Sequence, residues 1–188
     1  MSPLFYSFLR IYLIATIVSI ALVASCSGIP TKKGPEHVGV DPDAKPYVDE
    51  YLWLSAQNHI TFKNKVTVGF SNINDGDTVA YCYFGSNFRE IEIDIKYWNY
   101  YTNTSKLTVL LHELSHCYCH RDHDHAGLMY PETKEGREAE AKKPTPKPGF
   151  YDDGCPLSLM YPSVTSDACA RAHYQEYTTE LFEGCEPY

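Results

Sequence analysis

Two histidines and a glutamate between them are the residues of this chain whose types and spacing point most directly to chemistry. His112 and His116 stand four residues apart, so on a helix both imidazoles lie on one face and can bind the same metal ion. Glu113 lies about 100° further round that helix, within reach of a water molecule on the ion. The alternative is an amphipathic helix with two surface histidines. The spacing favours a metal site that activates water.

The segment after the second histidine is rich in metal-ligand residue types. Together with the histidine pair it resembles the metzincins, zinc peptidases with the pattern His-Glu-x-x-His-x-x-Gly-x-x-His, or the same with Asp last. In that pattern the glycine allows a sharp turn that brings the third ligand to the metal. This chain has Cys119 at the glycine position and Asp122 at the last position, with His123 one residue later. The resemblance implies Zn²⁺ held by the histidine pair, with Glu113 as the general base.

The third ligand depends on the length of the turn after the helix. A turn of metzincin length presents Asp122, and a turn one residue longer presents His123. Because Cys119 disfavours the positive φ that the tight turn needs, we predict the longer turn with His123 as ligand and Asp122 as the alternative. The same run resembles a His-Cys-x-x-x-Arg-x-His run in a group of bacterial metallopeptidases. His120 and His125 are expected to face solvent.

Metzincins also carry a tight turn with a methionine beneath the metal, in the form Ala-Leu-Met-Tyr-Pro in matrixins. The string Leu-Met-Tyr-Pro occurs twice here, around Met129 and around Met160. Met129 follows the ligand segment closely, as in matrixins. Met160 stands in Cys-Pro-x-Ser-Leu-Met, which resembles the turn of the bacterial group, and a helix-like segment follows it. We therefore predict Met160 for this turn, with Met129 as the alternative.

The N-terminal end has the pattern of an export leader. Residues 1–25 carry a single charge and an apolar run that is too short to predict a membrane span. The run ends in Val-Ala-Ser followed by Cys26, which resembles the bacterial lipobox and implies cleavage before Cys26 and lipid on it. The lipid would anchor the protein to a membrane, the outer membrane if the host is Gram-negative; otherwise the protein is secreted. Residues 26–45 are expected to form a tether and residues 46–188 a metallopeptidase domain, with a mobile insertion at 131–149.

Charge and cysteine content limit the partners and the compartment. The formal net charge is −8 at pH 7, which makes binding to nucleic-acid phosphates unfavourable. An even number of cysteines after Cys26 predicts disulfides in an exported protein. Cys117 and Cys119 are too close to bond each other, so at least one is expected to bond Cys155 or Cys169. The sequence leaves the full pairing open among Cys82, Cys117, Cys119, Cys155, Cys169 and Cys185.

Hydrophobic periodicity predicts an α+β fold in one domain. The helix with the metal ligands is expected over residues 104–118, after several N-cap candidates. The element order resembles the plan of a metzincin-like zincin: an N-terminal helix, a small twisted sheet, the zinc-binding helix, the methionine turn and a C-terminal helix. The other expected elements are helices over 47–58 and 167–182 and strands over 66–70, 79–84 and 88–95.

These observations predict a zinc-dependent metalloendopeptidase that acts as a monomer on peptide or protein substrates at the cell envelope or outside the cell. One alternative is a lipid-anchored envelope binding protein whose zinc site is structural or vestigial. Another is a zinc hydrolase that cleaves peptidoglycan cross-links. The substrate and the cleavage preference are not encoded in any motif of the chain.

Overall fold

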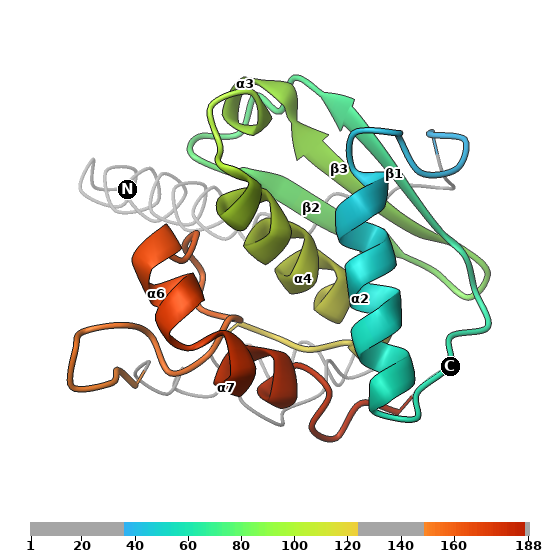
Figure 1. Ribbon diagram of the computed structural model, residues 1–188. Coiled ribbons are helices and arrows are strands. Elements are labelled where there is room, and N and C mark those ends of the chain that lie inside the picture. Colours follow the sequence, from blue (N-terminus) through green and yellow to red (C-terminus); the bar gives the residue numbers. More distant parts are fainter. Residues whose placement is uncertain (1–35, 124–148, 187–188) are drawn as a thin grey trace, which may run out of the picture. The chain divides into compact units, whose positions relative to one another are not determined.

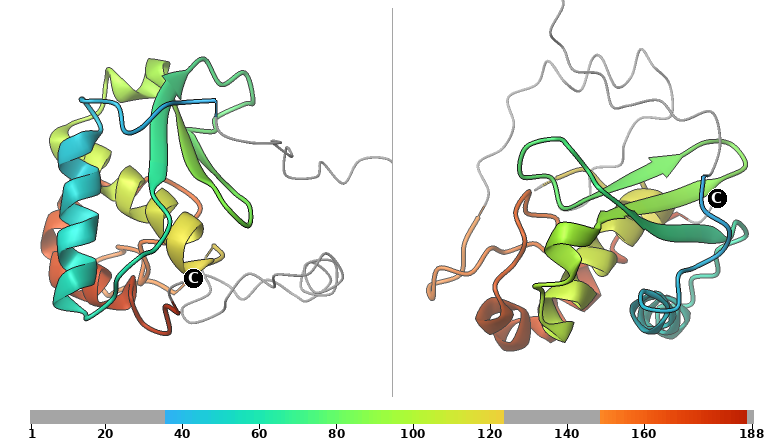
Figure 2. Two further views of the ribbon diagram at one scale, coloured as in Figure 1. Left: turned by 90° about the vertical axis from the view of Figure 1, so that its right-hand side faces the viewer. Right: turned by 90° about the horizontal axis from the view of Figure 1, so that it is seen from above.

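The computed structural model describes residues 36–123 and 149–186 (Figure 1). These residues form an α+β fold, as the hydrophobic pattern predicts, with a small three-stranded sheet and helices packed on one of its faces (Figure 2). The predicted leader, Cys26, the insertion at 131–149 and Met129 lie outside the described residues, except for Gly149. The elements are α2 (Lys45–Gln57), β1 (Val66–Ser71), β2 (Ala80–Phe84), β3 (Arg89–Asp94), α3 (Ile95–Trp98), α4 (Asn103–Cys119), α6 (Asp167–Ala172) and α7 (Tyr174–Glu180).

The sheet has the order β1-β3-β2, with β1 parallel and β2 antiparallel to the central strand β3. Ile91 and Ile93 of β3 are fully buried, and Glu90 and Asp94 on the other face of the strand are buried as well. The strand ends one residue earlier than predicted because the side chain of Asp94 accepts a hydrogen bond from the Lys96 N–H and caps α3. Strand β2 is left at an edge of the sheet.

Helix α4 packs against β2 and β3 and lies beside α2. It begins where the Thr102 hydroxyl accepts a hydrogen bond from the Ser105 N–H, as expected of an N-cap residue. Leu110 and Leu114 are fully buried and direct one face of α4 into the core. The histidine-bearing helix is therefore held by an apolar stripe, and its bounds are close to those predicted from the sequence.

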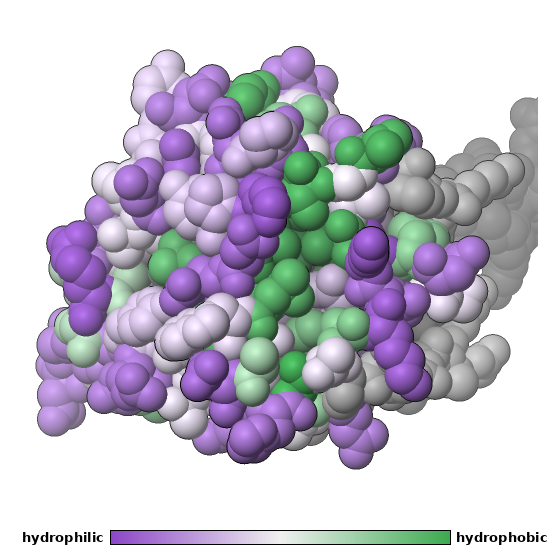
Figure 3. All heavy atoms as spheres, turned by 45° about the vertical axis from the view of Figure 1, so that its right-hand side comes forward, coloured by the Kyte–Doolittle hydropathy of each residue, from purple (hydrophilic) through white to green (hydrophobic). Residues whose placement is uncertain are grey.

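Aromatic rings pack together in the core between α2, α4 and the C-terminal segment. Tyr118 stacks on Phe62 with ring centroids 4.1 Å apart, and Tyr51 contacts Phe182 at 5.1 Å. The space-filling view shows a cluster of apolar side chains on one face, surrounded by polar ones (Figure 3). The described helices include none that is long and apolar enough to cross a membrane.

Residues N-terminal to α2 also contact the sheet. The backbone N–H groups of Glu36 and His37 both donate to Oε1 of the buried Glu90 on β3. Val40 forms a parallel bridge with Val68 of β1. These contacts bring the chain across the sheet before it enters α2.

The C-terminal helix predicted over 167–182 is two helices, α6 and α7, and the prediction of one helix is wrong. The break falls at His173, whose φ of −117° is not helical. Its imidazole stacks on Tyr151 with ring centroids 3.8 Å apart, and its Nε2 lies 2.8 Å from an Asp153 carboxylate oxygen. These contacts to the loop before α6 account for the departure from helical geometry.

The cysteines after Cys26 form three disulfides: Cys82–Cys117, Cys119–Cys185 and Cys155–Cys169. The prediction that disulfides form is confirmed, and such a set is typical of proteins outside the cytoplasm. The predicted bond from Cys117 or Cys119 to Cys155 or Cys169 is wrong. Along α4, Cys117 reaches the edge strand β2, whereas Cys119 reaches the chain after α7, so each has a nearer partner.

Candidate metal centre

The structure brings three imidazoles together at the end of α4. The Nε2 atoms of His112 and His116 lie 2.9 Å apart, and Nε2 of His123 lies 3.2 Å from each of them. His112 and His116 come from consecutive turns of α4, and His123 comes from the segment after it. These three side chains form a group that could hold a metal ion.

The turn after α4 explains why His123 joins this group. The helix runs through Cys119, which is tied to Cys185, and the left-handed residue is His120 with φ of 51°. The turn therefore begins one residue later than in the metzincin pattern, and His123 takes the third position. The Asp122 carboxylate instead accepts a hydrogen bond from the His123 N–H at 2.7 Å.

His120 does not face solvent, and the prediction that it would is wrong. Its side chain is only 6% exposed and stacks on Phe84 of β2, with ring centroids 4.7 Å apart. The left-handed backbone at His120 directs the ring toward the edge strand. His125, for which the same prediction was made, lies outside the described residues.

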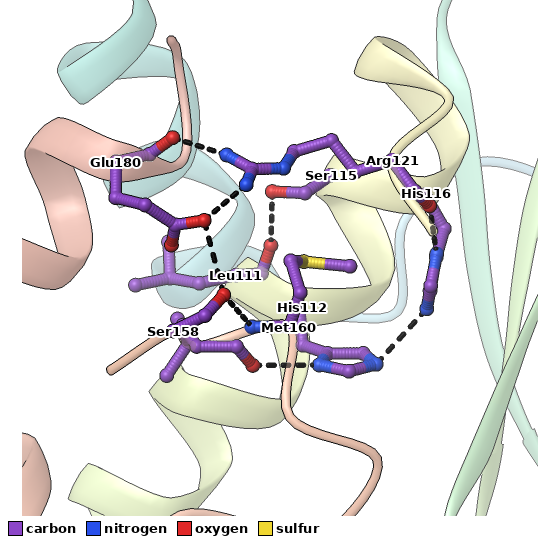
Figure 4. A network of polar contacts seen from close by, with 9 residues as sticks. Leu111, His112, Ser115, His116, Arg121, Ser158, Met160 and Glu180 are labelled. Carbon is purple, nitrogen blue, oxygen red and sulfur yellow. Dashed lines mark hydrogen bonds and ion pairs between the residues drawn. The ribbon is translucent and has the colours of Figure 1, made fainter. Parts of the chain in front are cut away.

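The two helical histidines are oriented by backbone carbonyls (Figure 4). Nδ1 of His112 lies 2.8 Å from the Leu159 carbonyl, and Nδ1 of His116 contacts the Arg121 carbonyl. A carbonyl only accepts, so Nδ1 carries the proton in each ring and the lone pair is on Nε2. Both lone pairs are therefore available where the three Nε2 atoms converge.

Burial keeps these imidazoles neutral. It lowers the pKa of His112 to about 4, with a further lowering by the charge of His123. Burial also lowers the pKa of His116 well below its ordinary value, and the neighbouring His112 and His123 add to this. Neutral imidazole is the form that binds a metal, so at neutral pH no proton has to leave these two candidate ligands.

Glu113 lies beside the histidine group but is not part of it. It faces β2, and its side chain is 8% exposed. Burial raises the pKa of Glu113 to about 8, and the backbone N–H of Cys82 partly offsets this by stabilising the carboxylate. A carboxyl group next to the ligands, with a pKa near neutrality, is suited to accept and return a proton.

This pKa gives a pH-dependent prediction for the metal-free protein. The unfolded carboxyl loses its proton above about 4.5 and the folded one only near 8, so between these values the folded state binds more protons. The Glu113 carboxyl therefore lowers the free energy of unfolding as pH rises through this range, by up to about 1.4 kcal/mol per pH unit. Glu113→Gln removes this contribution. Urea unfolding after chelator treatment should find the variant increasingly more stable than wild type as pH rises through this range; a constant difference contradicts the assignment.

The turn that carries the predicted methionine contacts the first histidine through its backbone. Met160 is fully buried, and its backbone N–H donates to the Ser158 hydroxyl at 2.9 Å. The residue between them, Leu159, supplies the carbonyl that accepts from His112. The turn around Met160 thus contributes a backbone contact as well as packing (Figure 4).

Sequence reasoning did not identify Arg121 and Glu180 as parts of the site. Arg121 is 1% exposed, and its guanidinium forms an ion pair with the Glu180 carboxylate at the end of α7. Arg121 stands inside the His-Cys-x-x-x-Arg-x-His run, so the motif held a signal for it. Glu180 has no local signal, because its partner Arg121 is 59 residues away in the sequence.

A second cluster of ligand-type residues contains Asp153, Cys155 and His173. Cys155 is bonded to Cys169, so its sulfur is not available as a thiolate ligand. His173 is engaged with Asp153 at 2.8 Å. This cluster is therefore explained by a disulfide and a hydrogen bond, and the histidine group remains the candidate metal centre.

The choice between His123 and Asp122 can be tested directly. His123→Ala is expected to lower metal content sharply, because it removes an Nε2 that lies 3.2 Å from both other imidazoles. Asp122→Asn is expected to retain most of the metal, since the amide oxygen can still accept from the His123 N–H. Elemental analysis of the dialysed proteins measures both. The opposite result would make Asp122 the ligand.

Comparisons of the chain with protein-family models, with curated proteins and with solved structures find no match in any of the three. The imidazole group, Glu113 and the elements that hold them therefore carry the functional inference.

Proposed function

We propose that this protein is a zinc-dependent metalloendopeptidase with a metzincin-like site. The observation that carries the proposal is the convergence of three imidazole Nε2 atoms, each pair within 3.2 Å, beside a buried carboxyl group on the same helix. The left-handed turn after α4 and the buried Met160, which follows the Leu159 carbonyl at His112, support the metzincin-like assignment. The fold around them is α+β, as that assignment requires.

The donor set fits a catalytic zinc ion. Imidazole nitrogen suits Zn²⁺ well, and three protein ligands leave one coordination position for water. In the described part of the chain the group has three members, whereas a structural zinc site usually has four protein ligands. The carbonyls of Leu159 and Arg121 supply the outer hydrogen bonds that fix ligating histidines.

When bound, Zn²⁺ would supply Lewis acidity, which polarises a peptide carbonyl and lowers the pKa of a water molecule. Glu113 takes a proton from the attacking water and then gives it to the leaving amine. The Cys82 N–H keeps the carboxyl of Glu113 directed toward β2 and favours its ionised form. Burial of Glu113 disfavours the ionised form, so the same group can act as base and then as acid.

Strand β2 offers a place for an extended substrate. The Asp94 N–H donates to the Val79 carbonyl, and the Gly85 N–H donates to the Phe88 carbonyl. Odd-numbered residues in and next to β2 therefore bond to β3, and the even-numbered residues direct their backbone groups away from it. The N–H of Cys82 is already engaged by Glu113, so a bound peptide would use the backbone groups on either side of it. A peptide laid along this edge would add a strand next to Glu113.

The proposed location is the cell envelope, with lipid on Cys26 as the anchor to the membrane. The disulfides support a place outside the cytoplasm, and the acidic charge of −8 makes nucleic acid an unfavourable partner. The protein is proposed to act as a monomer on peptide or protein substrates.

The test is hydrolysis by the purified oxidised protein of unfolded casein and, separately, of purified cell wall. We expect cleavage of casein, loss of cleavage with a chelator and recovery on adding Zn²⁺. Cleavage of cell wall alone would favour a peptidoglycan hydrolase. Stoichiometric zinc without cleavage of either substrate would reject the enzyme and favour a binding protein with a structural site.

A further inference from the structure

One carboxylate on the C-terminal helix connects the groups that hold the two helical histidines. Glu180, the last residue of α7, forms an ion pair with Arg121, whose backbone carbonyl contacts Nδ1 of His116. The same carboxylate oxygen, Oε1, accepts a hydrogen bond from the Ser158 hydroxyl at 3.0 Å. Figure 4 shows Glu180 facing both partners. Glu180 is thus one contact away from each supporting segment.

The branch through Ser158 leads to His112. The Ser158 hydroxyl donates to Glu180 and accepts from the Met160 N–H at 2.9 Å. These two bonds fix the turn on either side of Leu159, whose carbonyl lies 2.8 Å from Nδ1 of His112. The position of that carbonyl therefore depends on the Ser158–Glu180 contact.

The branch through Arg121 leads to His116. The guanidinium donates to the Glu180 carboxylate and also to the Glu180 backbone carbonyl, so its end is held at two points. The side chain is 1% exposed and cannot exchange these partners for water. The Arg121 carbonyl that contacts His116 is therefore tied to the end of α7.

The ion pair is poorly explained by stability alone. The Nε of Arg121 and the Oε2 of Glu180 are buried, and neither has a hydrogen-bond partner among the described residues. A buried pair that leaves polar atoms unsatisfied is often no more stabilising than apolar residues of the same size. Its place between the two histidine branches points to a role in positioning.

We propose that Glu180 is a positioning residue that sets the orientation and tautomer of His112 and His116 through two separate branches. The metal-binding part of this inference rests on the proposed function, whereas the tautomer part concerns the metal-free protein. Loss of outer hydrogen-bond partners of ligating histidines typically costs about 10–100-fold in metal affinity. Because Glu180 acts on those partners and is not itself one of them, Glu180→Ala is expected to lower zinc affinity by about 10-fold, the lower end of that range, without displacing Glu113.

The experiment compares Glu180→Ala and Ser158→Ala with Glu176→Ala, an exposed control on the same helix. Imidazole ¹⁵N shifts of the metal-free full chain report the tautomer of each ring, and chelator competition reports zinc affinity. We expect mixed tautomers at His112 and His116 in the Glu180 variant. In the Ser158 variant we expect a change only at His112. The control should match wild type in both measurements.

His173 serves as an internal reference, because its partner is Asp153 and it lies outside the network. Wild-type shifts at both ligand rings in Glu180→Ala would overturn the proposal. An equal change in the ¹⁵N shifts of His173 would also overturn it, because it would indicate a general loss of structure. An equal effect of Ser158→Ala on His112 and His116 would overturn it as well. If Glu180→Ala does not fold, the proposal is decided by whether Ser158→Ala changes the ¹⁵N shifts of His112 and leaves those of His116 unchanged. Tautomer changes in a chain that binds no zinc would reject the proposed function and retain the positioning role.

Discussion

Replacing Glu113 with glutamine is expected to lower kcat by about 10²–10⁴-fold while zinc content stays at the wild-type level. Glutamine keeps the shape of the side chain and can accept from the Cys82 N–H, but it cannot take a proton from water. Glu113 is not part of the imidazole group, so its replacement leaves all three nitrogen donors in place. The loss should therefore appear in the chemical step, with little change in metal binding.

The measurement is peptide hydrolysis at saturating substrate, together with elemental analysis of the same samples. Glu176→Gln is the matched control, because it makes the same change at an exposed position of α7. Full activity in Glu113→Gln would reject this residue as the base. Loss of zinc along with activity would instead place the carboxylate among the ligands.

The parts of this site that the sequence predicts are those set by contacts between near neighbours in the chain. The helix around His112 and His116 follows from an apolar stripe and a hydroxyl N-cap, both local features. The lack of glycine at position 119 predicts a longer turn with His123 near the histidine pair, and the structure has the left-handed residue at His120, one position later. Since His120 is not glycine either, avoidance of a positive φ does not by itself explain where the turn begins.

The parts that could not be predicted depend on contacts between distant segments. The pairing of Cys119 with Cys185 spans 66 residues, and local spacing says nothing about which segment passes the helix end. Burial of His120 depends on the approach of β2, and the break at His173 depends on the loop that carries Asp153. Long-range packing decides these features, and it has no periodic signal in the sequence.

The same limit applies to the groups that support the candidate metal site. Motif resemblance located Met160, but the group near it that contacts His112 is the Leu159 carbonyl, which no side-chain pattern encodes. Arg121 and Ser158 each stand in a short motif, yet their common partner Glu180 becomes evident only when α7 is placed beside both. Sequence patterns thus predict the candidate ligands better than the groups that orient them.

Replacing His116 with alanine is expected to abolish stoichiometric zinc binding. Nε2 of His116 lies 2.9 Å from that of His112 and 3.2 Å from that of His123, so its removal leaves two protein donors where a catalytic zinc site usually has three. The fall in affinity should exceed the roughly 10–100-fold expected when only an outer hydrogen-bond partner is lost. Activity should fall with the metal.

Zinc content after dialysis and chelator competition measure this effect, and thermal unfolding of the metal-free form checks that the variant still folds. His59→Asn is a suitable control, because His59 is exposed and has a φ of 60°, a conformation that asparagine tolerates. A folded His116→Ala protein that keeps stoichiometric zinc would locate the ion elsewhere. Since Glu113 has its proposed role only beside an ion held by this helix, that result would remove the basis for the peptidase assignment as well.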